Sequence, residues 1–149
     1  MGKVKKLIPI RRLHDHCWKL MSVFVKLRDN DKCVTCGKRV TGQNAHASHY
    51  IHGDVYDFNE ICINLQCGNY CHFLFGQRSP HQKSVEVRER YRKYLEGKWG
   101  KEKVDALVIE KHKILKRTRQ DYEDIRKDLE CRIAQLLAEK IANNLSQEA

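Results

Sequence analysis

Two short stretches decide the fold of this chain: Cys33-Val34-Thr35-Cys36 and Cys67-Gly68-Asn69-Tyr70-Cys71-His72. Each stretch brings two cysteines within one turn of the chain, and two such pairs match the ligand spacing of tetrahedral zinc sites. The chain has 149 residues, of which 41% are hydrophobic, so it can bury only a modest core. A metal would replace part of that core, and we expect a small hairpin built around zinc.

The predicted zinc ligands are Cys33, Cys36, Cys67 and Cys71. The second pair has three residues between its cysteines instead of the usual two. Cys62 or His72 therefore remains an alternative ligand for one of the four positions.

The cysteines also indicate the compartment. The N-terminal apolar patch is too short for a signal peptide, and no run of about 18 apolar residues could span a bilayer. In a chain without an export signal, close cysteine pairs more often hold a metal than form disulfides. We therefore expect a cytoplasmic protein with reduced thiols and no membrane partner.

The charge of the chain favours a polyanionic partner. Lys and Arg number 29 against 19 Asp and Glu, which gives a formal net charge of +10. Cationic side chains that neutralise phosphates release counterions and gain affinity, so we expect DNA as the partner. The candidate DNA-binding residues are Arg11, Arg12, Arg88, Arg92, Lys116, Arg117 and Arg119.

Apolar periodicity predicts helices at residues 13–28, 84–95 and 101–115, a short strand at 45–51, and a long helix capped by Thr118. We expect residues 1–29 to form a basic arm and an N-terminal helix, residues 30–83 a zinc-bound core, and residues 84–149 a helical extension for DNA binding and dimerisation.

The long helix carries a narrow apolar stripe that needs a partner. Its residues are Tyr122, Ile125, Leu129, Ile133, Leu136, Leu137 and Ile141. We expect a homodimer joined through this stripe. The alternative is a monomer in which the stripe folds back on the chain's own helices at residues 13–27 and 85–95.

A histidine cluster lies between the cysteine pairs. His46, His49 and His52 fall within seven residues, and His72 directly follows the last cysteine. Residues three apart on a strand point to opposite faces, so His46 and His49 meet at one metal only if the strand bends. The alternative is that these histidines have no catalytic role and are surface side chains of a zinc finger or additional ligands of its zinc ion.

An ordered set of motifs resembles the NinG (Rap) family of phage recombination endonucleases, within the wider HNH, or ββα-metal, nucleases. The motifs are Cys33-x-x-Cys36-Gly37, His46-Ala47-Ser48-His49-Tyr50, Phe58-Asn59-Glu60, Gln66-Cys67, Cys71-His72 and Gly76. The resemblance implies an α+β fold with a treble-clef zinc core, flanked by an N-terminal helix and a long helical C-terminal extension. It also implies metal-dependent cleavage of branched DNA, such as four-way junctions, in a bacterial host cell.

The resemblance also assigns catalytic roles. It makes His49 the general base and His46 and His72 the ligands of a catalytic divalent metal, which we expect to be Mg²⁺ or Mn²⁺. The family's mid-motif asparagine is Cys62 here, so Asn59 or Asn64 could take over its orienting role. An ungapped alignment would instead put Tyr70 at the fourth zinc position.

We therefore predict a structure-selective DNA endonuclease that hydrolyses a phosphodiester with a histidine base and one divalent metal. The alternative is a non-catalytic, zinc-stapled DNA-binding protein that bridges or regulates recombination.

Overall fold

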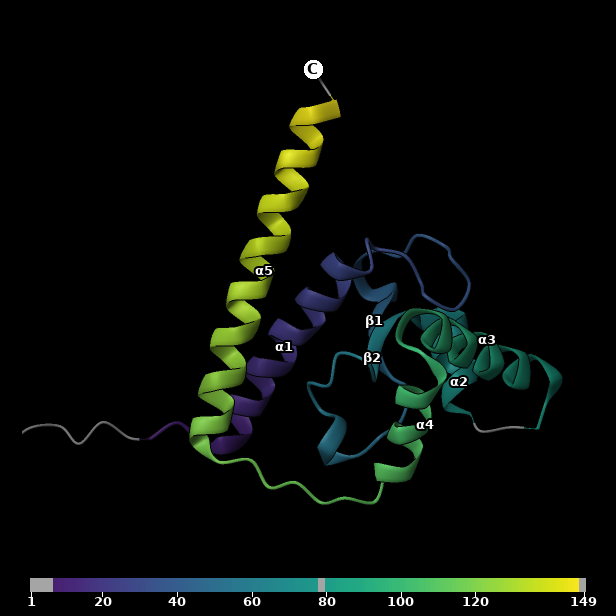
Figure 1. Cartoon of the computed structure of the whole chain (residues 1–149), viewed down its shortest axis with the longest axis horizontal. Helices are drawn as coiled ribbons and strands as arrows, with labels where there is room; N and C mark the ends of the chain where they lie inside the picture. Colours follow the sequence, from purple (N-terminus) through teal and green to yellow (C-terminus); the bar gives the residue numbers. More distant parts are fainter. Residues whose placement is uncertain (1–6, 78–79, 148–149) are drawn as a thin grey trace, which may run out of the picture.

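The computed structural model describes residues 7–77 and 80–147, so the first part of the predicted basic arm, residues 1–6, lies outside them. The described chain combines five α-helices with one small antiparallel sheet, as predicted for an α+β protein (Figure 1). Its elements are α1 (Ile10–Arg28), η1 (Gly42–Asn44), β1 (Ala45–His49), η2 (Asp54–Tyr56), β2 (Ile63–Cys67), η3 (Gly68–His72), α2 (Phe73–Gly76), α3 (Gln82–Trp99), α4 (Lys101–Glu110) and α5 (Arg119–Gln147). No helix in these ranges is long and apolar enough to cross a membrane.

Helix α1 begins earlier than predicted, directly after Pro9. Proline is tolerated at a helix start because its missing N–H would have no partner there. Leu13, Cys17 and Met21 are buried on the face that the apolar spacing predicted. The helix ends at Arg28 with Asp29 as its C-cap, and Asn30 then adopts a left-handed φ of 54° and turns the chain toward the first cysteine pair.

The sheet consists of β1 and β2, paired antiparallel with Ala45 opposite Cys67 and His49 opposite Ile63. All five residues of β2 are buried. The predicted strand over residues 45–51 ends at His49, because the chain bends at Tyr50, whose N–H donates to the Cys62 carbonyl at 2.7 Å. β1 therefore delivers His46 and His49 at its two ends, and β2 delivers the third cysteine.

A buried ion pair fastens α1 to β2. The guanidinium of Arg28 donates two hydrogen bonds to the Asp29 carboxylate, both at 2.8 Å, and one to Asn64 Oδ1 at 2.9 Å. The Asp29 carboxylate also accepts the Leu65 N–H at 2.9 Å. The Asp29 side chain is only 3% exposed, so these partners replace the water that it loses.

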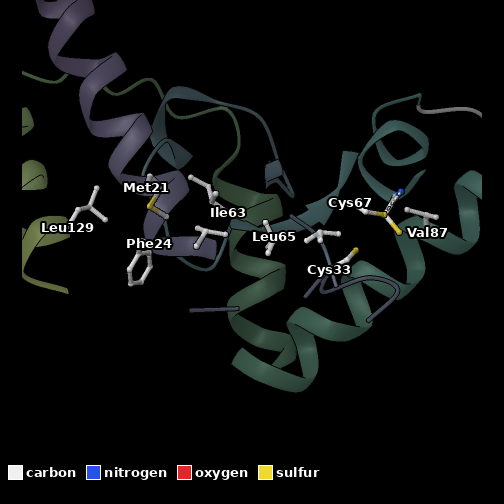
Figure 2. Close-up of a cluster of buried hydrophobic side chains, with 11 residues drawn as sticks. Met21, Phe24, Cys33, Ile63, Leu65, Cys67, Val87 and Leu129 are labelled. Carbon is white, nitrogen blue, oxygen red and sulfur yellow. Dashed lines mark hydrogen bonds between the residues drawn. The ribbon is translucent and has the colours of Figure 1, made fainter. Parts of the chain in front are cut away.

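The main core lies between the helices and the sheet. Figure 2 shows Leu129 of α5 and Met21 of α1 at one end, Ile63 and Leu65 of β2 in the middle, and Val87 of α3 beside Cys67 at the other end. The segment that carries the cysteine pairs therefore shares its core with three helices.

Helices α3 and α4 differ from their predicted lengths. Helix α3 extends through Gly97 and ends at Trp99. The next residue, Gly100, has a φ of 88° that favours glycine, and its N–H donates to the Glu96 carbonyl at 2.9 Å. Helix α4 ends at Glu110, before Ile114 and Leu115. These two side chains are 82% and 44% exposed, so no buried face continues the helix.

Helix α5 packs along α1 and then continues past it (Figure 1). At its start Thr118 Oγ1 accepts the Asp121 N–H at 3.3 Å, which is the predicted cap. Tyr122 and Leu129 are buried, and the Cys17 thiol donates to the Tyr122 carbonyl at 3.3 Å. The first half of the apolar stripe therefore folds back on α1, which was the alternative to a dimer contact for these residues.

Candidate metal centre and histidine cluster

The four predicted zinc ligands come together. The Sγ atoms of Cys33, Cys36, Cys67 and Cys71 all lie within 4.8 Å of one another, and those of Cys36 and Cys67 are 3.9 Å apart. Tetrahedral zinc with Zn–S bonds of about 2.3 Å requires sulfur atoms roughly 3.8 Å apart. Within residues 7–77 and 80–147, no other group of three or more Cys, His, Asp or Glu side chains converges in this way. The donor set and the spacing both fit a structural zinc ion.

Hydrogen bonds within the quartet favour the thiolate form of Cys33 and the protonated form of Cys71. A hydrogen bond from the Cys71 side chain is the largest cause that lowers the pKa of Cys33, to about 4, and backbone N–H groups add to it against the cost of burial. The same contact raises the pKa of Cys71. A cation that binds all four sulfurs would displace the remaining protons, because thiolates are the ligands of zinc.

The extra residue in the second cysteine pair is absorbed by η3, a π-helical turn over Gly68–His72. A π-turn accommodates one more residue than an α-turn, so Cys71 still reaches the quartet. The Cys67 sulfur accepts the Cys71 N–H at 3.3 Å and closes the turn. Tyr70 is 48% exposed and stays outside, which excludes the ungapped alternative.

Cys62 is not a zinc ligand in this arrangement. Its thiol is fully buried, donates to the Ile51 carbonyl at 3.2 Å and accepts the Ile51 N–H at 3.3 Å. Burial raises the pKa of Cys62 to about 11, so the thiol stays protonated. Through these two hydrogen bonds Cys62 connects the segment after β1 to the residue that precedes β2.

His46 and His72 form the first half of the histidine cluster. Their rings stack with centroids 4.9 Å apart and planes at 24°. The Nδ1 atom of His72 lies 3.0 Å from the hydroxyl of Ser48, which is 1% exposed and shares a face of β1 with His46. Burial, followed by the charges of His46 and two other histidines, lowers the pKa of His72. His72 is therefore neutral near pH 7 and able to bind a metal.

His49 has a different environment. Its ring is stacked on Trp18 of α1, with centroids 4.9 Å apart and planes at 1°. Its Nε2 lies 3.1 Å from Asp57 Oδ1, and the second carboxylate oxygen lies 3.3 Å from His14 Nε2. Burial would raise the pKa of Asp57, but the hydrogen bonds from His49 and His14 outweigh it and lower that pKa. His46 and His49 therefore face different neighbours, as their odd spacing on a strand predicted.

A family model described as "Bacteriophage Lambda NinG protein" matches residues 2–139. The chain belongs to the NinG family. Comparisons with curated proteins and with solved structures gave no match. The match covers the zinc quartet, all four clustered histidines and most of α5.

Neither candidate asparagine of this NinG chain contacts the clustered imidazoles in the hydrogen bonds that the structure describes. The Asn59 side-chain oxygen accepts the N–H groups of Ile61 and Cys62 at 2.9 and 3.1 Å and so shapes the turn before β2. Asn64 is fully buried and bonds to Arg28 and to the Tyr91 hydroxyl. Asp57, a carboxylate, occupies the position next to His49.

The predicted DNA-binding residues fall into three groups. Arg92 pairs with Glu96 and Asp105, and Arg119 donates to the Ile8 carbonyl. Arg117 donates to the backbone carbonyls of Asp54 and Asp57 at 2.7 and 2.8 Å. Arg11, Arg12 and Lys116 are exposed on the surface. Arg88 lines a cavity of about 670 Å³ that adjoins the histidine cluster at His52 and whose lining includes Tyr50, Phe75, Lys111 and His112.

Four residues at or near the histidine cluster were not predicted from the sequence. They are His14, Trp18, Ser48 and Asp57. His14 and Trp18 are four apart on α1 and therefore share a face, which was a detectable signal. Nothing in the sequence told which side of α1 meets β1. Asp57 and Ser48 carry no spacing signal, because their roles depend on how loops and strands approach one another.

Proposed function

We propose that this NinG protein is a metal-dependent DNA endonuclease of the HNH type that acts on branched DNA in phage recombination. The observations that carry the proposal are the stacked imidazoles of His46 and His72 and the His49 imidazole, which is held by Asp57 and Trp18 and whose charge also acts on the pKa of His72. A passive zinc finger needs neither a histidine with a carboxylate partner nor two further stacked imidazoles that could bind a metal. The net charge of +10 supports a phosphate-rich substrate.

His49 acts as the general base in this proposal. It removes a proton from a water molecule while the water oxygen attacks the phosphorus, one P–O bond of the phosphodiester breaks, and the leaving oxygen takes up a proton. A neutral imidazole carries a lone pair on one ring nitrogen, and that nitrogen can accept the proton.

His46 and His72 would hold the catalytic cation. The hydroxyl of Ser48 occupies His72 Nδ1 and leaves Nε2 as the free ligand atom, an orienting contact typical of metal-binding histidines. Two imidazoles leave the other coordination positions open for water and phosphate, and they favour Mn²⁺ over the harder Mg²⁺. When bound, such a cation stabilises the charge of the transition state and of the leaving oxygen.

DNA would dock through exposed cations around the site. Arg11 and Arg12 at the start of α1 and Lys116 before α5 are free to approach phosphates without losing a partner that the structure describes. Arg88 would contribute from the cavity beside His52. Arg92, Arg117 and Arg119 have partners within the protein, so we expect them to contribute less to DNA affinity.

The proposal includes a homodimer formed by the outer part of α5. Leu137, Ile141 and Leu145 are 45%, 61% and 63% exposed, and they recur every four residues on one helical row. Helix α5 continues past α1 in this region (Figure 1). Two symmetric cuts at a four-way junction need two active sites in a fixed relation, which a two-fold dimer provides.

The second candidate is a zinc-stapled protein that binds DNA without cutting it. It is favoured by the histidine cluster itself, since among the described residues His46 and His72 have no third Cys, His, Asp or Glu that completes a compact metal group. In that case His49 and His72 would be dispensable for every DNA-related activity.

One experiment separates the two candidates. Purified protein is incubated with a labelled four-way junction and with linear duplex in Mg²⁺, Mn²⁺ or EDTA. We expect metal-dependent cleavage of the junction that His49→Ala abolishes while junction binding stays within a few fold. His72→Ala should be comparably inactive but partly rescued by more metal, and His16→Ala, an exposed histidine of α1, is the control. Cleavage by His49→Ala at the wild-type rate, or no cleavage under any condition, would refute the proposal.

A further inference from the structure

The His49 imidazole is fixed on more than one side. Trp18 covers one ring face at an interplanar angle of 1°, and the Asp57 carboxylate meets the Nε2 edge at 3.1 Å. The His49 side chain is 13% exposed, so bulk water competes little for this hydrogen bond. The ring therefore has one defined plane and one defined nitrogen directed at the carboxylate.

We propose that Asp57 is a positioning residue that selects the reactive tautomer of His49, an inference that rests on the proposed nuclease function. A carboxylate only accepts hydrogen bonds, so His49 must carry its proton on Nε2 to satisfy the contact. Nδ1 then keeps its lone pair and is the atom that accepts a proton from water. When Nδ1 takes that proton, the ring becomes an imidazolium, and the negative charge of Asp57 stabilises it.

Asp57 is itself held from two directions. Its second oxygen accepts a hydrogen bond from His14 Nε2 at 3.3 Å, so each carboxylate oxygen has its own imidazole donor. Its backbone carbonyl accepts from Arg117 at 2.8 Å. These contacts leave Asp57 little freedom to rotate away from His49.

The backbone beside Asp57 is strained. Phe58 has a φ of 72°, in the left-handed region that a residue with a bulky side chain rarely adopts. The Phe58 ring meets His14 at 5.4 Å and Trp18 at 6.4 Å, and the Arg117 guanidinium lies 5.3 Å from its centroid. Strain of this kind persists only where the surroundings enforce it, and here the same surroundings aim Asp57 at His49.

The first test is Asp57→Asn. An amide can donate a hydrogen bond to Nε2, which moves the ring proton to Nδ1 and removes the base. We expect kcat on the junction to fall by at least about 100-fold, the range of general-base catalysis, with KM and junction affinity within a few fold of wild type. The control is Asp54→Asn, since Asp54 lies in the same loop with an exposed side chain.

A second measurement does not depend on cleavage. Nitrogen-15 NMR of histidine-labelled, zinc-loaded protein reports which ring nitrogen carries the proton. We expect His49 protonated at Nε2 in wild type and in Asp54→Asn, and shifted toward Nδ1 in Asp57→Asn. If no protein cuts DNA, the nuclease proposal fails, while the NMR still decides the tautomer. Cleavage by Asp57→Asn within a few fold of wild type, or the same His49 tautomer in both proteins, would overturn the inference.

Discussion

The imidazole of His46 lies directly over Gly68, the first residue of the turn that leads to the last cysteine of the quartet. A Cβ atom at position 68 would stand 2.4 Å from His46 Cδ2 and 2.5 Å from Nε2, which is closer than real Cβ contacts come. The absence of a side chain at residue 68 is therefore what lets His46 lie next to His72.

Gly68→Ala should displace His46 without releasing zinc. We expect the metal concentration for half-maximal cleavage to rise at least about tenfold, since the loss of a well-placed ligand or of its support costs on the order of 10- to 100-fold in metal affinity. The measurement is a Mn²⁺ titration of the cleavage rate. Gly97→Ala is the control, because a Cβ there meets nothing within 4 Å, and it should leave the titration unchanged. An unaltered titration for Gly68→Ala would show that His46 does not bind the metal.

Two cysteine-to-serine changes should give opposite results. Cys71→Ser removes a quartet sulfur, so we expect less than one equivalent of bound zinc and loss of the cooperative unfolding transition. Cys62→Ser keeps a hydroxyl that can bond to Ile51 and should retain a full equivalent. Metal analysis of the purified proteins, with thermal unfolding followed by circular dichroism, checks both. If Cys62→Ser lost its zinc while Cys71→Ser kept it, the assignment of the four ligands would be wrong.

Breaking the buried ion pair should destabilise the whole domain. Asp29→Asn leaves the Arg28 charge without its partner, and the loss of one member of a buried pair costs about 3–5 kcal/mol. Urea unfolding measures the change. Glu130→Gln, which removes one acidic partner of Arg126 on the surface, is the control and should change the free energy of unfolding by less than about 1 kcal/mol. Equal effects from both variants would contradict a special role for Asp29.

Ile141→Glu should convert the proposed dimer to a monomer of 17.6 kDa and keep the zinc site intact. Ile141 is 61% exposed, so the charge meets water in the monomer and an apolar partner only in the dimer. Ile133 is a poorer choice because it packs against the main core, and a glutamate there would also damage the fold. Light scattering at micromolar concentration gives the mass. Wild-type protein that already scatters as a monomer would refute the dimer.

Local signals in the sequence predicted most of the elements. The apolar spacing located α1, and the Thr118 cap placed the start of α5 within one residue. Boundaries failed where packing decided them: β1 stops at His49 because Tyr50 turns to bond with Cys62, and α4 stops at Glu110 because the apolar residues that follow, Ile114 and Leu115, are exposed. The fate of the long stripe could not be predicted, because a periodic face does not show which surface will cover it.

The cysteine ligands of the candidate site were predictable because zinc geometry constrains their spacing along the chain. The contacts of His49 were not predictable, since they join α1, β1 and the loop after η2, three segments whose approach no local pattern encodes. The orienting role expected of Asn59 or Asn64 shows the same limit. Both side chains could orient a histidine chemically. In the structure, however, Asn59 bonds to the backbone of the turn before β2, and Asn64 bonds to Arg28.

The π-helical turn at Gly68–His72 bears on how relatives of this chain can be recognised. The π-helical turn accommodates the extra residue between Cys67 and Cys71. His72 still directly follows Cys71 in the sequence. A gap of three residues between the third and fourth cysteines is therefore compatible with the quartet. A search pattern that fixes the gap at two residues would discard chains built like this one, and a pattern anchored on the dipeptide would keep them.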